Sequence, residues 1–318
     1  MKLGKIAQLA VLAAAFISLP LSVHADFKGH HAPGGWGLQS GTQVPPAGGF
    51  LLSSYYSGYY ADKLVDHDGT EINVTGKDHD ITVNSFGLFG WWVSNFKVLG
   101  ANWGMTASVY AVDNLIEIDV FESHTNYNFA DIFIQPVNLG WHLTQADFMV
   151  TYGVYFPTGK YSVDGDDNTG MGMWTHEFGA GATYYFDKEK KWHISAMGYY
   201  EINSKKEDTD IKVGNILTVE GGIGRSWYDG ALSAGLAYYA QWKLSNDTVG
   251  GLDRINPRLP SSFNLNKSQL YGLGPEVNIP IFILEKLICV VTARYQWEFG
   301  ARSTLEGQAF NLYFNFPL

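Results

Sequence analysis

The chain has 318 residues, of which 46% are hydrophobic and 15% are aromatic, and its formal net charge at pH 7 is −10. This acidic excess disfavours nucleic acid and anionic lipid as partners, because both are themselves negatively charged. Cys289 is the only cysteine. The sequence therefore excludes an intrachain disulfide, and it excludes a zinc site or a redox pair built from sulfur.

The first 25 residues have the pattern of a secretory signal peptide. Lys2 and Lys5 precede an apolar block that ends near Leu21, and Val23 and Ala25 supply small side chains at the −3 and −1 positions of a cleavage site. We expect cleavage after Ala25, which removes both lysines and takes the charge from −10 to −12. A membrane anchor is the alternative. The block is short for a span, however, and it is interrupted by Gln8, Ser18, Pro20 and Ser22.

An irregular segment, 26–49, comes next and reads DFKGHHAPGGWGLQSGTQVPPAGG. Its seven glycines and three prolines disfavour both a helix and the interior of a sheet. We therefore assign residues 26–48 to a separate N-terminal segment and residues 49–318 to one domain.

Twelve stretches with period-two alternation of apolar and polar residues follow, and each is long enough to cross an outer membrane at a tilt. They are approximately 49–61, 80–93, 98–112, 128–142, 147–158, 173–186, 191–203, 214–228, 231–243, 268–282, 287–301 and 307–318.

The connections between these stretches alternate in length. The short ones are Ser94–Lys97, Leu143–Ala146, Asp187–Lys190, Asp229–Gly230 and Ile283–Lys286. The long ones are 62–79, 113–127, 159–172, 204–213 and 244–267, and Ser303–Glu306 is the one brief member of that side. Short turns on one side, long loops on the other and an even strand number predict an all-β fold. This fold is a transmembrane antiparallel β-barrel of 12 strands in the bacterial outer membrane.

Aromatic residues gather near both ends of the predicted strands, as the two girdles of such a barrel require. Trp91, Trp92, Trp103, Trp141, Tyr185, Trp192, Trp227 and Tyr228 lie beside the short turns, and Tyr110, Tyr127, Trp174, Trp242 and Trp297 lie toward the long loops. A soluble β-sandwich, the alternative fold, explains neither the girdles nor the unequal connections.

The faces of the strands can be assigned from charge. In 287–301, Trp297 and Phe299 share one face while Arg294 and Glu298 share the other. An Arg or Lys that faced lipid at mid-bilayer would cost about 2–4 kcal/mol, so the charged face should line the lumen. Two strands are irregular: Pro136 predicts a β-bulge in 128–142, and Arg225 falls on an apolar face. Arg225 is either turned inward by a bulge or extended toward the periplasmic surface.

Alternation places a set of polar and aromatic side chains in the lumen, where they form the predicted channel lining and solute path. These are Glu177, Glu201, Glu220, Glu276, Glu298, Asn278, Lys243, Arg294, His193, Tyr110 and Tyr199. The simpler interpretation is that they pair with one another and only solvate the interior. Their acid excess predicts a mild preference for cations.

His30 and His31 do not form a convincing metal site, because adjacent side chains of an extended segment point apart and no acidic cluster lies nearby in sequence. We expect them to bond the segment to the acidic lumen wall, in a manner sensitive to pH. The stretch DGDDNTG (164–170) is similar to a calcium loop, but Thr169 and Thr175 occupy the places of its glycine and its bidentate glutamate. We expect neither a metal nor a cofactor.

Four stretches resemble, in order and spacing, the SphA-like outer-membrane channel family that is associated with the meta-pathway of phenol degradation (MetA type). They are HHAPGGWGLQSGTQVPPAGGFLLSSYYSGYYADKL (30–64), GVYFPTGKY (153–161), YGLGPEVNIPI (271–281) and EGQAFNLYFNFPL (306–318). The resemblance implies a monomeric channel for small hydrophobic or aromatic molecules, whose N-terminal segment enters the lumen. A barrel of twelve strands is wide enough to admit such a segment and narrow enough for the segment to block it. The plug would then include His30, His31, Pro33, Gly34, Gly35, Trp36, Pro45 and Pro46.

The sequence thus predicts a channel for passive passage of small apolar or aromatic solutes, partly closed by this segment. Its other partners would be outer-membrane lipid and lipopolysaccharide. A general porin of small conductance is the first alternative. The second is a lipid-modifying enzyme, for which His176 is the one histidine clearly on an outward face, although nothing in the sequence brings an orienting group to it.

Overall fold

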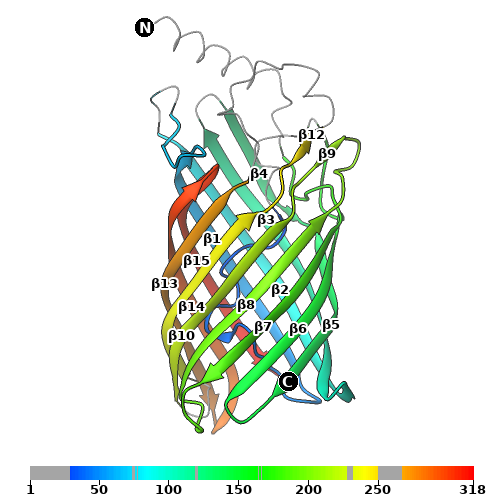
Figure 1. Ribbon diagram of the computed structural model, residues 1–318, viewed down its shortest axis with the longest axis vertical. Coiled ribbons are helices and arrows are strands. Elements are labelled where there is room, and N and C mark those ends of the chain that lie inside the picture. The colour runs from blue at the N-terminus through cyan, green and yellow to red at the C-terminus, as the bar shows by residue number, and fades with distance from the viewer. Residues whose placement is uncertain are drawn as a thin grey trace, which may run out of the picture.

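The computed structural model describes residues 29–73, 76, 78–118, 121–163, 165, 167–227, 232–249 and 267–318. The predicted signal peptide (1–25), and Asp164 and Asp166 of the calcium-like loop, lie outside these ranges. Within them, twelve strands form a closed antiparallel barrel (Figure 1). They are β1 (Phe50–Val65), β2 (Asp80–Val98), β3 (Ala101–Ile118), β5 (Ile132–His142), β6 (Ala146–Phe156), β7 (Thr175–Tyr185), β8 (Trp192–Asn203), β10 (Ile216–Trp227), β11 (Leu232–Lys243), β13 (Gln269–Ile283), β14 (Lys286–Arg302) and β15 (Thr304–Pro317).

The remaining short elements are not part of this ring of twelve. Strand β4 (Phe121–Phe129) extends the sheet by pairing with Ala111–Ile118 of β3, while β9 (Ile211–Lys212) and β12 (Thr248–Val249) pair with each other. A single 3-10 turn, η2 (Gly37–Gln39), lies in the N-terminal segment. None of the helices in the described ranges has the length and apolar character needed to cross a membrane.

Each strand of the ring pairs with its neighbours in chain order, and β1 closes the ring by pairing with β15. At the seam Leu51 lies opposite Pro317, and the N–H of Leu318 donates to the carbonyl of Phe50 over 2.8 Å. Closure pairs the edge strands with each other, as a sheet in lipid requires.

The predicted alternation of short and long connections is present, with two corrections to its details. The predicted turn Ser94–Lys97 belongs to β2, and the chain reverses instead at Leu99–Gly100, where both residues have a positive φ. The register shifts between Val93 and Lys97, so a bulge absorbs the residues that the alternation had assigned to a turn. The predicted long loop 113–127 consists mostly of the paired ends of β3 and β4, which continue the ladder beyond the barrel.

Both irregular strands are resolved. The register shifts between Ile134 and Val137, which confirms the bulge predicted at Pro136, and the carbonyl of Pro136 accepts a hydrogen bond from the Trp103 indole. Strand β10 has no register shift, so a bulge does not turn Arg225 inward. Its guanidinium lies 5.5 Å from the ring of Trp192 and 5.0 Å from that of Trp227, among aromatic residues beside the short turns.

The strand faces follow the charge assignment. On β14, Trp297 and Phe299 are about half exposed, at 55% and 51%, whereas Arg294 and Gln296 are buried at 2% and 0%. Apolar side chains thus cover the outside of the barrel and polar ones are buried within it. Such an outside matches the hydrocarbon of a bilayer.

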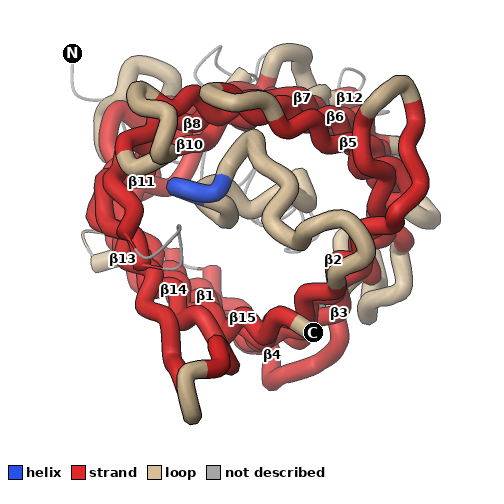
Figure 2. The backbone as a smooth tube through the Cα atoms, turned by 90° about the horizontal axis from the view of Figure 1, so that it is seen from below, coloured by secondary structure: helices blue, strands red, loops and turns tan. Residues whose placement is uncertain are grey.

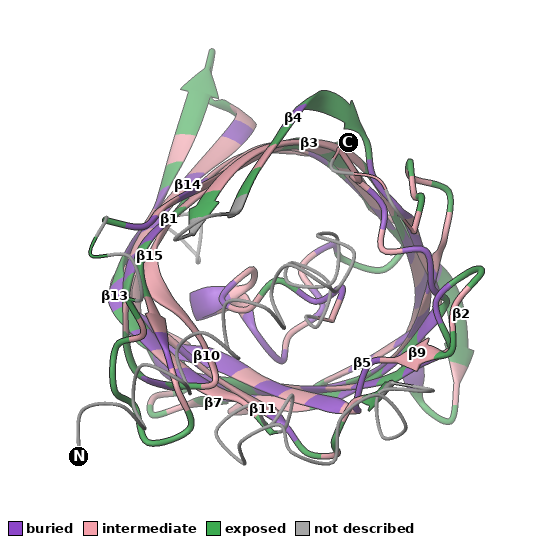
Figure 3. Cartoon of the chain, turned by 90° about the horizontal axis from the view of Figure 1, so that it is seen from above, coloured by how far each residue is buried: buried purple, intermediate pink, exposed green. Residues whose placement is uncertain are grey.

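The lumen is crossed by the N-terminal segment. Figure 2 and Figure 3 show the chain ahead of β1 inside the ring of strands, with η2 against the wall near β10 and β11. His30 contacts Asp131 and Thr175, which lie where the long connections join β5 and β7, whereas Thr42 contacts Asp147 close to a short turn. Residues 29–49 therefore run along most of the length of the barrel.

Candidate functional site

The site is the contact between the N-terminal segment and the inner wall, and it begins at His30. The Nε2 atom of His30 lies 2.8 Å from Oδ2 of Asp131, and Nδ1 lies 2.7 Å from the hydroxyl of Thr175. The other carboxylate contacts of Asp131 are with the long connection that follows β6, since it accepts the backbone N–H groups of Gly159 and Met171 over 2.9 and 2.7 Å. One buried carboxylate therefore joins the segment to an outer loop.

His31 is held by carboxylates on both edges of its ring. Nδ1 lies 2.7 Å from Glu177 and Nε2 lies 3.4 Å from Glu220, while the ring stacks on Tyr199 at a centroid distance of 4.2 Å. The backbone N–H groups of both histidines donate to Oε1 of Glu201. Burial alone would lower the pKa of His31, but the charges and hydrogen bonds of Glu177 and Glu220 outweigh burial and raise it well above its ordinary value.

A tight turn around Gly34 and Gly37 is fastened by an ion pair. Arg294 Nε lies 2.7 Å from Oε2 of Glu276, and its Nη1 donates to the carbonyl of Gly34. The same Glu276 oxygen accepts the N–H of Leu38 over 2.9 Å. Gly37 has a φ of +53°, and a Cβ there would collide with this ion pair, so the turn requires glycine at this position.

Leu38 is inserted into the wall itself. It is 3% exposed, and Cβ atoms added to Gly222, Gly224 or Gly235 would lie 2.6 to 2.9 Å from its side chain. These glycines of β10 and β11 therefore form a socket for Leu38. On the opposite side, Trp36 packs edge-on against Trp91, with centroids 5.6 Å apart.

The lower part of the segment is bound by neutral and charged hydrogen bonds. The carbonyl of Ser40 accepts the Thr183 hydroxyl over 2.7 Å, and Thr42 donates to Asp147 over 2.7 Å. Gln43 donates to the side chain of Asn138 over 2.9 Å. Gly48 and Gly49 then exchange backbone hydrogen bonds with Val93, which attaches the end of the segment to β2: Gly48 N–H donates to Val93 over 2.9 Å and Val93 N–H donates to Gly49 over 3.0 Å.

Arg294 should be the most costly of these contacts to remove. We expect Arg294→Met to destabilise the protein by about 3–5 kcal/mol, because it leaves Glu276 buried without its cation. Unfolding in urea, followed by tryptophan fluorescence, measures this. The double variant Arg294→Met, Glu276→Gln should recover much of the loss, and equal destabilisation by both variants would contradict the role of the pair.

The predicted channel-lining residues divide into two groups. Glu177, Glu201, Glu220, Glu276, Arg294 and Tyr199 contact the N-terminal segment directly. Asn278 reaches the segment only through Glu276, and Glu298 accepts hydrogen bonds from Tyr59 and Tyr239 of the wall. His193 is buried on β8, where its side chain hydrogen-bonds to the backbone of Leu38 in the segment, and Tyr110 is partly buried on β3. Lys243, the last residue of β11, pairs with Asp247 at 2.8 Å.

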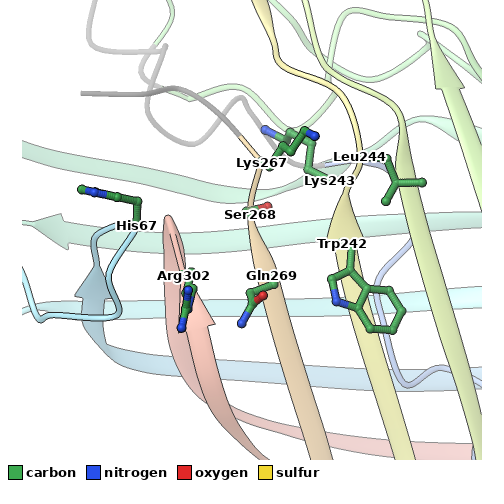
Figure 4. A pocket seen from close by; sticks show the side chains of 8 residues that line it. All are labelled: His67, Trp242, Lys243, Leu244, Lys267, Ser268, Gln269 and Arg302. Atoms are coloured by element: carbon green, nitrogen blue, oxygen red, sulfur yellow. The ribbon is translucent and has the colours of Figure 1, made fainter. Parts of the chain in front are cut away.

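A cavity of about 340 Å³ lies beside Lys243, at the end of the barrel that carries the long loops (Figure 4). Its lining includes Lys243, Lys267 and Arg302, together with His67 and Trp242. The cavity is cationic, in contrast to the carboxylates deeper in the barrel.

Sequence reasoning missed several residues of the site. Asp131 was missed because the alternation of its strand is interrupted near the bulge, and Tyr155, which stacks on His30 at 4.6 Å, was not assigned to a face. Thr183 and Ser195 lie on regular strands, and alternation alone could have placed them inward. His176, the residue considered for lipid chemistry, is exposed and contacts the hydroxyl of Tyr152 at 2.9 Å.

The fold is similar to that of a known outer-membrane channel. The crystal structure of the COG4313 outer membrane channel from Pseudomonas putida F1 matches with a TM-score of 0.73 and 13% identity, over 91% of this chain and 100% of that chain. A Pseudomonas aeruginosa FadL homologue matches more loosely, with a TM-score of 0.39 and 11% identity, over 92% of this chain and 98% of that chain. Among curated proteins, none matches this sequence significantly.

The barrel, its apolar outside and the first of these likenesses identify a protein of the bacterial outer membrane with a channel fold. A family model described as "Putative MetA-pathway of phenol degradation" matches residues 61–314, which is most of the chain. The chain therefore belongs to this phenol-degradation family of outer-membrane proteins, in agreement with the SphA-like resemblance of its sequence.

Proposed function

We propose that this protein is a channel for the passive passage of small hydrophobic or aromatic molecules, and that residues 26–48 act as its lumenal plug. The observation that carries the proposal is the chain of contacts between the segment and the inner wall, from His30 at the outer end to Gln43 near the short turns. The family description, which concerns phenol degradation, supports the aromatic solute class.

The nature of the contacts favours a plug that can be released. Most of them are hydrogen bonds and charge pairs to side chains, while the strands that form the wall are joined to one another by continuous backbone ladders. Water can replace polar contacts of this kind at a net cost of about 0.5–1.5 kcal/mol for a neutral hydrogen bond and about 1.5–3 kcal/mol for one to a charged group. The segment can then move without unfolding of the barrel.

Passage would follow the concentration gradient in two steps. Extracellular loops and inward aromatic side chains such as Tyr110 capture the solute, and rearrangement of the plug then uncovers Tyr199 and opens the path. We further propose that the protein acts as a monomer and that its outer loops contact lipopolysaccharide.

Liposome swelling separates this function from that of a general porin. We expect vesicles that contain the protein to admit small neutral aromatic solutes such as phenol several-fold faster than sugars such as arabinose, after subtraction of the rate in protein-free vesicles. Sugars that entered as fast as phenol would favour a porin of small conductance. An enzyme would be indicated instead by phospholipid turnover that His176→Ala abolishes.

A further inference from the structure

Two aromatic stacks inside the barrel share one arrangement. The imidazole of His31 lies on the ring of Tyr199, and the imidazole of His30 lies on the ring of Tyr155, with centroids 4.2 and 4.6 Å apart. In both stacks the edge of the imidazole meets a carboxylate, 2.7 Å away for His31 and 2.8 Å away for His30. Each imidazole is thus held by stacking on one face and by hydrogen bonds at its edge.

The residues around His31 belong to the wall and not to the segment. Glu177, Tyr199 and Glu220 come from β7, β8 and β10, which are consecutive in the sheet. Their spacing is therefore fixed by the strand ladders, independently of His31. Oε1 of Glu220 accepts no hydrogen bond from the described residues, although it lies 3.4 Å from the imidazole. The wall thus presents an aromatic face between two acceptors, one of which has unused capacity.

We propose that Glu177, Tyr199 and Glu220 form a binding site for a neutral planar ring that carries a hydroxyl group, and that His31 occupies this site in the closed channel. This inference rests on the proposed function and specifies its solute class. The ring of a phenol stacks on Tyr199 as the imidazole does, and its hydroxyl donates to a carboxylate.

Other aromatic classes fit the site less well. A benzoate carries a negative charge that both carboxylates repel, and it has no proton to donate. Toluene can stack on Tyr199 but leaves the carboxylates without a donor. The neutral hydroxyarene therefore competes with His31 for the site, most effectively at alkaline pH, where the imidazole is neutral as well, and its binding displaces the imidazole.

Removal of the internal competitor tests the proposal. In the full-length barrel, His31→Gly leaves a space over Tyr199 that phenol or imidazole can fill. We expect both probes to raise the melting temperature of His31→Gly by several degrees at millimolar concentration, whereas toluene and benzoate leave it unchanged. The wild-type protein should need roughly tenfold more phenol for the same shift, because its own imidazole competes. His31→Ala repeats the test without the added backbone freedom of glycine.

Two further variants determine whether binding occurs at this place. Adding Tyr199→Leu to His31→Gly should weaken phenol binding about tenfold, and His124→Gly, which changes an exposed histidine of β4, should behave as the wild type. Folded His31→Gly and His31→Ala proteins that bind no phenol, or that bind toluene equally well, would overturn the site. This readout does not depend on transport: phenol that binds but does not enter vesicles would refute the channel function and leave the site intact.

Discussion

Deletion of residues 26–47 should raise the single-channel conductance several-fold while the barrel remains folded. Residues 29–47 run along the lumen, whereas the twelve strands form a complete ladder without them. The deletion retains Gly48 and Gly49, whose hydrogen bonds with Val93 hold the start of β1. Planar bilayer recordings of the wild-type and deleted proteins measure the effect.

The deletion should also make the channel more selective for cations. Without the segment, Glu177, Glu201 and Glu220 lose their histidine partners and face an aqueous lumen. Reversal potentials in a salt gradient report this change. A variant that replaces residues 26–47 by a Gly/Ser chain of equal length is the matched control, because it keeps the chain length but not the anchors. If the conductance of the deleted channel equalled that of the wild type, the segment would lie outside the conducting path.

Closure of the channel should weaken as the pH rises above neutrality. His31 faces Glu177 on β7, Glu201 and Tyr199 on β8, and Glu220 on β10, and its pKa is raised well above the ordinary value of about 6.5. A raised pKa means that the protonated histidine stabilises the bound segment. This stabilisation is fully present below the ordinary pKa, and it is lost as the pH rises through the raised one.

We therefore expect the open fraction of the wild-type channel to be low at pH 6 and to increase in alkaline solution. His31→Gln is the control, because glutamine can donate one hydrogen bond but does not titrate in this range. In this variant, the open fraction should be higher at pH 6 and should no longer change with pH. An alkaline step of equal size in the variant would assign the effect to other groups, such as the tyrosines.

Most of the wall could be predicted from the sequence. Along a barrel strand, apolar side chains face lipid and polar ones face the lumen, so the alternation of the two shows which way each side chain points. Arg294 and Trp297 lie on the predicted sides of β14 for this reason. The turn after β2 was misplaced because a bulge between Val93 and Lys97 adds residues that interrupt the period of two. The ends of β3 and β4 were missed because a hairpin beyond the membrane has no lipid face and therefore no apolar pattern to report.

The lumenal contacts were less predictable, since they join residues far apart in sequence. From the sequence, His30 and His31 were expected to bond to an acidic lumen wall, and Glu177 and Glu220 were expected to face inward. Alternation does not show which histidine contacts which glutamate. Asp131, which joins the segment to an outer loop, precedes a strand with an interrupted period. The socket for Leu38 was also not predictable. Glycines in β10 and β11 do not by themselves indicate that a side chain from another segment packs against them.

The attachment of the segment to β2 through Gly48 and Gly49 has a consequence for the concentration dependence of opening. A released segment stays tethered at one end, so its histidines remain at an effective concentration in the millimolar range near their sites. A solute that competes with them must reach a comparable concentration in the lumen. The channel would then respond to abundant solutes and reclose by itself when they are depleted, since rebinding of a tethered segment needs no encounter from solution.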